Sequence, residues 1–472
     1  MTLLIKGGRV LTFNSDNSIS FPIKDVLIDG NRIAKIDDKI EFTCETIDAT
    51  DKIVSPGFID GHRHCWQSHL RGSTANLTLL GYLGEMLLGR AMFYRPQDVY
   101  LAQVGAVTEA IHCGITTVLD HSHIQLSEEH IKKCIQASIE SGIRSVYCFA
   151  PINLPSSLNP LMMRDLASEH TRQMNLFYKL AAETPLGGPL NDGRVTLGLG
   201  YDGLQYRPLE DTRKLFTFAK QHQMPIALHD AEAHGMPAIT FCNQNDLTSD
   251  AMVFSHASYT TDADLKQIMQ AGAGIASTPE SEMQMGHGWP EGFRARRMGC
   301  KVGLGVDSSA ICSGDMFYTM RIMLQTQRAR DNAEIYAKGK IPKKLSAMVE
   351  EVIHMATLGG AEAIHKEKDL GSIEVGKLAD IILISTDGPS MIANVDLASA
   401  MVLHATPADV DTVIVNGEVV KKEGKLTRIN WEEVKKELVQ NRLELEEMYK
   451  HIDWDTNTKE VAESWYLWHN AE

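Results

Sequence analysis

Eight short apolar runs, separated by stretches with a helical pattern, most constrain the fold of this chain. The runs are rich in Val, Ile and Leu and are bounded by glycine, proline or polar residues, which is typical of buried parallel strands. Eight such strands alternating with helices predict an α/β fold with a closed (β/α)8 barrel. An open doubly wound sheet is the alternative, but no Gly-x-Gly-x-x-Gly turn opens a helix after an early strand, so its nucleotide-binding form lacks support. The runs cover residues 54–64, 115–121, 143–149, 195–201, 225–229, 252–256, 274–277 and 302–307.

Both ends of the chain have a different pattern, with short alternating strands broken by Gly, Asp and Asn. This pattern covers residues 1–54 and returns at 371–428, where the Asn416-Gly417 step is a strong hairpin signal. Alternating strands of this kind form antiparallel sheets. We therefore expect the two ends to build one small β-sandwich, which the barrel interrupts at 55–370.

The last segment, residues 429–472, has the pattern of a charged helix from Asn430, followed by the aromatic sequence SWYLWH. We expect this tail to pack on the outside of the barrel or on a neighbouring subunit. The alternative is a solvated helix face with an aromatic plug.

Composition and charge narrow the function classes. The 472 residues are 43% hydrophobic, which is enough for a large barrel core and a smaller companion. The formal net charge of −15 argues against nucleic acid or an anionic membrane as the main partner, because both require basic patches. A small neutral or cationic substrate is expected instead. The eight cysteines include no Cys-x-x-Cys pair, and the chain shows neither an apolar signal stretch nor a run that could span a bilayer, so we expect a cytoplasmic protein without disulfides.

Residue types that bind metal ions stand at the ends of several runs. His62 and His64 end the first run and, because they are two residues apart on a strand, project to the same side. His229 ends the fifth run and Asp307 ends the eighth. The carboxyl ends of barrel strands meet at one face, so these side chains can surround one ion. Three imidazoles and a carboxylate suit a divalent metal with an open position for water, and we expect one Zn²⁺, with Fe²⁺ as the alternative.

Each of these residues alone also has a structural explanation. A single His-x-His pair is more often structural than ligating. His256, at the end of the sixth run, can be a hydrogen-bonded core histidine, and Asp307 can cap a helix start before Ser308. Their joint placement at the same end of four runs favours the metal site.

Several motifs occur together in this chain. They are SPGFIDGHRH, the His-x-x-Glu from His229 to Glu232, the strand-end His256 and GLGVDSS, flanked by HCGITTVLDH, MATLGGAEAI and LGSIEVGKLADIILIS. In combination they resemble the amidohydrolase superfamily, in the branch that holds cytosine, guanine and adenosine-derivative deaminases and triazine hydrolases. The resemblance extends to about Thr427. It implies a distorted (β/α)8 TIM barrel with a split β-sandwich, a mononuclear metal site and assembly into homo-oligomers.

The resemblance also implies a role for each residue of the site. The four residues named above become the metal ligands, Glu232 becomes the general acid and proton shuttle, and His256 holds or polarises the attacking water. Asp307 can take the proton of that water while it contacts the ion. The alternative for Glu232 is an exposed carboxylate at a helix start. Binuclear members carry a bridging lysine at the end of the fourth strand, where this chain has GLGYDGLQ, so one metal is expected.

The activity implied is hydrolysis of a C–N bond in a cyclic amidine, because a bound divalent ion makes water a nucleophile near neutral pH. We expect an aminohydrolase that releases ammonia from a purine, pyrimidine, pterin or triazine-like ring. The alternatives are removal of halide or alkylamine from such a ring, or hydrolysis of a cyclic amide. A noncatalytic scaffold on the same fold is a more distant alternative, because such proteins typically lose ligands that this chain keeps.

Substrate contacts are the least constrained part of the prediction. The stretch after the first ligands, up to about Tyr94, commonly forms part of the substrate lid in this branch. The segment STPESEMQMGHGWP stands where related deaminases carry a pattern nearer to N-P-x-S-N. Ordinary wall packing is the alternative for all of these side chains. The candidate substrate-binding residues are Trp66, Gln67, His121, His123, Glu280 and His287.

Overall fold

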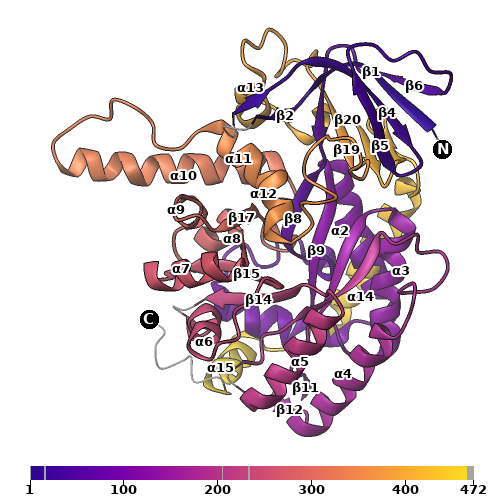
Figure 1. The fold of residues 1–472 in the computed structure, drawn as a ribbon. Helices are drawn as coiled ribbons and strands as arrows, with labels where there is room; N and C mark the ends of the chain where they lie inside the picture. Colours follow the sequence, from indigo (N-terminus) through magenta and orange to yellow (C-terminus); the bar gives the residue numbers. More distant parts are fainter. Residues whose placement is uncertain (1, 15–17, 205, 232–233, 465–472) are drawn as a thin grey trace.

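The computed structural model describes residues 2–14, 18–204, 206–231 and 234–464. Its main body is a closed barrel of parallel strands surrounded by helices (Figure 1). The eighth strand is split into two short pieces: the first pairs with β16 and the second pairs with β8, which closes the barrel. The predicted (β/α)8 barrel is therefore confirmed. Its strands are β8 (Phe58–His64), β9 (Ile115–Ser122), β10 (Arg144–Phe149), β13 (Val195–Gly200), β14 (Ile226–Ala231), β15 (Met252–Ser258), β16 (Gly274–Ser277), β17 (Lys301–Leu304) and β18 (Asp307–Ser308).

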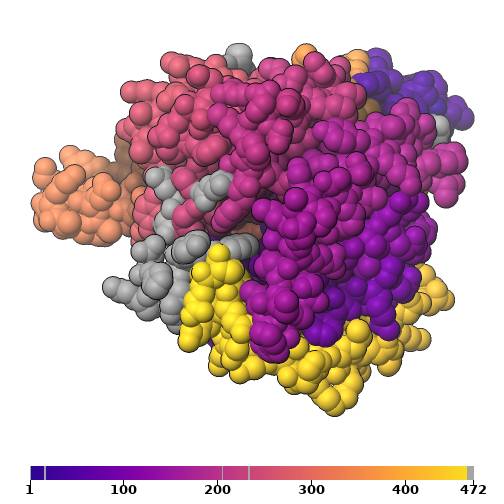
Figure 2. Space-filling model, turned by 90° about the horizontal axis from the view of Figure 1, so that it is seen from below, coloured from indigo at the N-terminus to yellow at the C-terminus, as the bar shows by residue number. Residues whose placement is uncertain are grey.

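The helices cover the barrel through one apolar face each. In α7 (Asp262–Ala271), Leu265 and Ile268 are buried, the Thr261 side chain caps the first turn, and Gly272 ends the helix in the left-handed conformation. The other barrel helices are α2 (Pro96–His112), α3 (Glu128–Ser141), α4 (Leu166–Ala181), α5 (Leu209–Gln221), α6 (Ala238–Gln244), α8 (Pro279–Gln284), α9 (Gly292–Arg297), α10 (Met316–Ala337), α11 (Val349–Ala356) and α12 (Leu358–Ala363). The far end of α10 and the loop after it project from the body (Figures 1 and 2).

The two ends of the chain share a second sheet, as the sequence predicted. β19 pairs antiparallel with β7, and so joins the late strands to the early ones. This sheet has its own hydrophobic core, which includes Ile5, Val26, Ile381 and Ile414. Its strands are β1 (Thr2–Val10), β4 (Ile23–Asp29), β5 (Arg32–Asp37), β6 (Glu45–Asp48), β7 (Lys52–Pro56), β19 (Ile381–Ser385), β20 (Val410–Val415), β21 (Glu418–Lys422) and β22 (Lys425–Leu426).

The first predicted run, 54–64, is two strands in the structure. β7 belongs to the terminal sheet, β8 belongs to the barrel, and the chain crosses between them at Gly57. A Cβ atom at Gly57 would lie 2.1 Å from the Thr116 hydroxyl oxygen, so this crossing needs a residue without a side chain. Both strands are apolar and buried, which is why the sequence pattern alone did not separate them.

The C-terminal tail lies on the outside of the barrel. α14 (Trp431–Tyr449) packs on α2, and α15 (Trp454–Ser464) packs on the π-helical segment η2 (Leu83–Leu87). Figure 2 shows these yellow helices along the lower face of the molecule. The aromatic residues after Ser464, expected to form a plug, lie outside the described residues.

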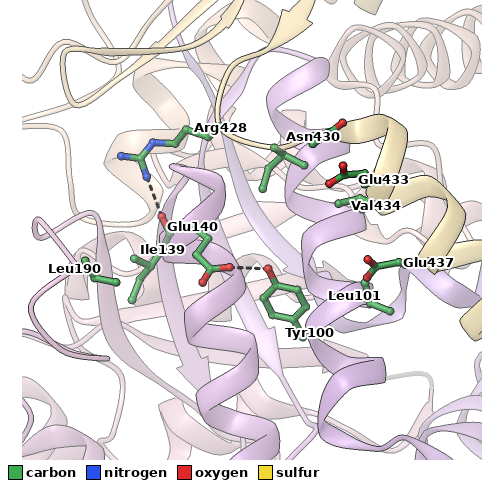
Figure 3. Close-up of a pocket in the computed structure, with 11 residues that line it drawn as sticks. Tyr100, Leu101, Ile139, Glu140, Leu190, Arg428, Asn430, Glu433, Val434 and Glu437 are labelled. Carbon is green, nitrogen blue, oxygen red and sulfur yellow. Dashed lines mark hydrogen bonds between the residues drawn. The ribbon is translucent and has the colours of Figure 1, made fainter.

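A hollow of about 550 Å³ lies between α2, α3 and α14 on this outer surface (Figure 3). Tyr100 donates a hydrogen bond to Glu140 across its floor, and Arg428 donates one to the carbonyl of Ile139 at its edge. Its lining contains no histidine or cysteine, so it does not compete with the strand-end site as a metal centre. Within the described residues, no helix is long and apolar enough to cross a membrane.

Candidate active site

The four predicted metal ligands come together at the carboxyl ends of the barrel strands. The Nε2 atoms of His64 and His229 are 3.2 Å apart. An Asp307 oxygen, Oδ1, lies 3.3 Å from His64 Nε2 and 3.5 Å from His62 Nε2. A tetrahedral ion with ligands at about 2.0–2.2 Å separates its donor atoms by about 3.3–3.6 Å. These distances suit donors of one zinc-sized ion, and His62, His64 and His229 also offer ligand atoms within 4.8 Å of one another.

The ring nitrogens that face away from this centre are bound by acceptors. His64 Nδ1 donates to the carbonyl oxygen of His121 at 2.6 Å, and His229 Nδ1 donates to the Asp202 carboxylate at 2.9 Å. An acceptor at Nδ1 requires a proton there, so the Nε2 atom of each ring carries a lone pair when that ring is neutral. Burial disfavours charge on His229, but the Asp202 carboxylate outweighs it and raises the pKa of that ring. A cation bound between the two Nε2 atoms, which are 3.2 Å apart, would favour the neutral form of both rings.

Burial sets the charges of the ligands. It lowers the pKa of His62, and it lowers that of His64 well below the usual value, so both rings are neutral as ligands must be. Burial alone would raise the pKa of Asp307, but the hydrogen bond to His62 and the neighbouring histidines outweigh it and hold that pKa well below its usual value. His62 Nδ1 lies 2.8 Å from the Ser255 hydroxyl, which holds the orientation of its ring.

Two site residues have a strained backbone. Asp307 has φ of 72° and His256 has φ of 74°, both in the left-handed region that residues with a side chain rarely adopt. Asp307 stands where the eighth strand breaks between β17 and β18. The break turns its carboxylate toward His62 and His64, which a regular strand would not do.

His256 lies beside the predicted ligands. Its ring centre is 5.4 Å from that of His62, and one of its nitrogens lies within 4.8 Å of ligand atoms of His62 and Asp307. Its Nδ1 lies 2.7 Å from the Thr278 hydroxyl. With Nδ1 bound, the opposite nitrogen is the one available to a water molecule at the centre.

Glu282, which the sequence analysis did not single out, supports His256 from behind. Its carboxyl is fully buried and accepts hydrogen bonds from the Thr278 amide at 2.7 Å and from the Ser277 hydroxyl. Burial raises its pKa to about 8. Glu282 Oε1 lies 3.9 Å from His256 Nδ1, so the two groups are linked through Thr278.

Asp202 is the second residue that the sequence analysis missed. It follows β13, and its carboxylate contacts three histidines: His121 on β9, His123 just after β9, and His229 on β14. Its position in the sequence could have indicated a role at the site, because Asp202 is an acidic residue just beyond the carboxyl end of the fourth barrel strand.

A cavity of about 460 Å³ opens over the metal ligands. His64, His123, Asp202 and His229 line its polar part. Such a cavity, apolar with a few convergent polar groups, suits a small flat molecule. Its remaining walls are formed by Leu79, Tyr82, Leu83, Leu87, Pro151, Ile152, Asn153, Met163, Leu166, Tyr201, Gly203, Leu204, Tyr206, Arg207, His234, Gly235, Met236, Pro237, Ala238, Phe241 and Ser464.

Trp66 and Gln67 do not line this cavity. Trp66 is fully buried and packs edge-on against Tyr94, so the structure gives it a core position rather than the expected stacking position. Gln67 donates to the Tyr82 hydroxyl and accepts from the Ser308 hydroxyl. Tyr82 does line the cavity, so Gln67 reaches it through Tyr82.

Of the other four candidate substrate residues, one lines this cavity and three do not. His123 lines the cavity, whereas His121 lies behind it against Asp202. His287 is buried with its ring centre 4.7 Å from that of His256. Glu280 accepts a hydrogen bond from the Ser313 amide and does not line the cavity. Glu232, the predicted general acid, lies outside the described residues.

Comparison with known proteins finds relatives over nearly the whole chain. A family model described as "Amidohydrolase family" matches residues 53–420. The 5-methylthioadenosine/S-adenosylhomocysteine deaminase of Caldicellulosiruptor saccharolyticus is 25% identical over 451 residues, covering 91% of this chain and 95% of its own. The deaminase of the same name from Thermococcus kodakarensis is 26% identical over 434 residues, covering 89% and 94%.

Solved structures share the fold. An atrazine chlorohydrolase from Arthrobacter aurescens, in complex with zinc, aligns with a TM-score of 0.79 and 23% identity, covering 93% of this chain and 100% of its own. An adenosine deaminase from Xanthomonas campestris, with bound zinc, aligns with a TM-score of 0.79 and 19% identity, covering 94% and 98%. The structural similarity thus extends over both the barrel and the terminal sheet.

Proposed function

The chain belongs to the amidohydrolase family and is a hydrolase of C–N bonds in heterocycles, and from that premise we propose which ring it attacks and with which residues. The proposed reaction replaces the ring amino group of an adenine-type compound with oxygen and releases ammonia. Purine nucleosides with a modified ribose are the first substrates to test, because the curated relatives are named as deaminases of such compounds.

The observation that carries the proposal is the approach of three imidazoles and one carboxylate to one another at the carboxyl ends of the barrel strands. His62, His64, His229 and Asp307 would hold the ion, and Zn²⁺ suits their types and spacing. A divalent ion bound there lowers the pKa of water and polarises the ring carbon under attack. The zinc complexes of the structural neighbours support the choice of metal.

The surrounding residues handle protons and orientation. Asp307 is ionised and lies at the centre, so its free oxygen can accept a proton from the attacking water. His256, held through Thr278, can keep that water in line by accepting a hydrogen bond. We assign delivery of protons to the ring nitrogen and the leaving amine to Glu232, three residues after the ligand His229.

The cavity supports a flat substrate with an apolar substituent. Leu79, Leu83, Met236 and Phe241 provide facing apolar walls, and the metal ligands form its polar end. A ring that enters with its amino group toward the ligands would leave its substituent among these walls. The same geometry would accept a triazine ring, so chloride or alkylamine as leaving group is the alternative.

The test is a substrate panel with zinc-reconstituted protein, assayed for ammonia and for chloride. The panel holds 5-methylthioadenosine, S-adenosylhomocysteine, adenosine, guanine, cytosine and a chlorinated triazine. We expect ammonia from at least one purine nucleoside. Chloride release without ammonia would support the alternative, and zinc-loaded protein that turns over no compound would contradict both.

Variants of the site residues sharpen the test. His229→Ala and Asp307→Ala should lose zinc, measured by elemental analysis, because each removes one of four donors. Glu232→Gln should keep zinc but lower kcat by about 10²–10⁴-fold, the usual contribution of a general acid. His222→Ala, at the exposed end of α5, is the control and should change neither the zinc content nor kcat. Full zinc occupancy in His229→Ala would show that the ligand assignment is wrong.

A further inference from the structure

The carboxylate of Asp202 accepts four hydrogen bonds from histidines. Oδ1 accepts from the backbone amide of His229 at 3.2 Å and from its Nδ1 at 2.9 Å. Oδ2 accepts from His121 Nε2 at 3.0 Å and from His123 Nε2 at 3.1 Å. One side chain after β13 thus joins β9 to β14 at the metal end of the barrel.

The contact with His229 decides which nitrogen that ring offers to a metal. A carboxylate only accepts, so the proton of the neutral ring must stand on Nδ1 and the lone pair on Nε2. The hydrogen bond from the His229 backbone amide to the same carboxylate also fixes the backbone from which the ring extends. Without Asp202, the proton could move to Nε2, and the ring would no longer be a ligand.

The contacts with His121 and His123 raise a competing possibility. Together with Asp202 and His229, these residues form a group of ligand atoms close enough to hold a second ion. A ligating histidine almost always donates its other ring N–H to an acceptor. The Nδ1 atoms of His121 and His123 have no hydrogen-bond partner within the described residues. As ligands through Nε2, both rings would bury an N–H without a partner, whereas as donors to Asp202 their N–H groups are satisfied and only the Nδ1 acceptors are left unpaired.

We propose that Asp202 is the positioning residue of the metal centre, and that it binds His121 and His123 as hydrogen-bond donors rather than sharing a second ion with them. This proposal rests on the proposed metal-dependent function. It assigns to Asp202 no contact with the reacting atoms: its effect passes through the tautomer and orientation of His229. One zinc ion per chain is the stoichiometry that follows.

Two variants of Asp202 grade its acceptor capacity, and the Asn variant does so at nearly constant volume. Asp202→Leu removes every acceptor, and Asp202→Asn keeps one oxygen that can still face His229. We expect the dissociation constant for zinc, measured by competition with a chelator, to rise about 10-fold in the Asn variant and about 100-fold in the Leu variant. Excess zinc should restore much of the turnover of the Asn variant, because its ligands are intact.

A spectrum separates positioning from general damage to the fold. With Co²⁺ in place of zinc, the visible absorption of the Asn variant should shift, since it reports the geometry of the ligands. Asp211→Asn, exposed in the first turn of α5, is the matched control and should keep the wild-type affinity and spectrum. If Asp202→Leu does not fold, the Asn variant still tests the proposal by both measurements.

His123→Gln distinguishes the two arrangements directly. It removes one donor to Oδ2 but leaves Oδ1 on His229, so we expect one zinc per chain in both the wild type and this variant. Two equivalents in the wild type that fall to one in His123→Gln would overturn the proposal in favour of a second ion. Wild-type zinc affinity in Asp202→Leu would overturn it as well. Absence of ammonia release would contradict the proposed function alone, because the affinity measurements do not depend on turnover.

Discussion

Glu282 shows how much a single buried residue can contribute to the pH dependence of this protein. Its carboxyl is fully buried, and no lysine or arginine of the described chain pairs with it. Burial raises its pKa to about 8, so in the folded protein it keeps its proton across the neutral range. In the unfolded chain the same group loses its proton near its ordinary pKa, about 4.5.

The folded state therefore binds one more proton than the unfolded state between about pH 4.5 and pH 8. Stability falls as pH rises through this window, by up to about 1.4 kcal/mol per pH unit, and levels off above it. We expect Glu282→Gln to remove this part of the slope, which urea unfolding at pH 5, 6, 7 and 8 would measure. Glu210→Gln, exposed on α5, should keep the wild-type slope. An unchanged slope in Glu282→Gln would mean that the group is not protonated in the folded protein.

Residues of the site differ in how far the sequence could predict them. The strand-end positions of His62, His64, His229 and Asp307 were sufficient to predict that they meet, because parallel strands bring their carboxyl ends together. Their role as ligands is still a prediction that the metal measurements test.

Two supporting acids could not be predicted in this way. Asp202 acts through histidines of other strands, and Glu282, whose hydrogen-bond partners Thr278 and Ser277 are local, comes near His256 only through the fold. Trp66 shows the opposite error, since an aromatic residue next to a ligand was expected to stack on substrate but is fully buried in the core.

Among the elements, α15 reaches the cavity from the tail of the chain. Asn457 donates a buried hydrogen bond to the carbonyl of Gly84 at 2.7 Å, and Ser464, at the end of the helix, lines the cavity. Asn457 is fully buried, and Leu83 in the same segment as Gly84 also lines the cavity. The charged helical pattern predicted a tail helix, but not that its second part would reach the site, because that depends on the path of the chain after α14.

One carbon atom added at Gly84 would disrupt the contact between α15 and η2. A Cβ at Gly84 would lie 2.5 Å from the Thr458 Cα, a backbone atom that cannot turn away. We expect Gly84→Ala to displace α15, to raise KM several-fold with a smaller change in kcat, and to speed proteolysis of the tail. Gly81→Ala is the matched control, since its nearest neighbour is the flexible Leu77 side chain at 3.1 Å. Equal KM values in both variants would show that α15 does not shape the cavity.

At the scale of the whole molecule, the strand pattern predicted the architecture better than the boundaries. Seven of the eight predicted runs overlap barrel strands and no strand of the terminal sheet, because buried parallel strands are continuous apolar runs. The run at 54–64 joined two domains, and the break in the eighth strand was not predicted, since neither Gly57 nor Asp307 interrupts the apolar pattern enough to mark it. Homo-oligomer assembly remains a prediction.

An ion pair between the terminal sheet and the barrel makes their joint stability testable. Arg144, the first residue of β10, donates from Nε and Nη2 to both oxygens of Asp380 at 2.8 and 2.9 Å; Asp380 is buried and Arg144 is partly buried. Asp380 also accepts from the Asn416 amide at 2.8 Å, so it cannot move to solvent without loss of that bond.

Arg144→Ala leaves the Asp380 carboxylate buried without its partner, which typically costs about 3–5 kcal/mol. We expect the free energy of unfolding in urea to fall by that amount. Arg144→Ala with Asp380→Ala should lose less than the sum of the single variants, because the unpaired charge is then gone. Activity per folded molecule should stay near the wild-type value, since Arg144 lies at the amino end of its strand, opposite the metal ligands. A loss below about 1 kcal/mol in Arg144→Ala would mean that solvent reaches Asp380 and that other contacts, such as the Arg194–Glu418 ion pair, join the two parts.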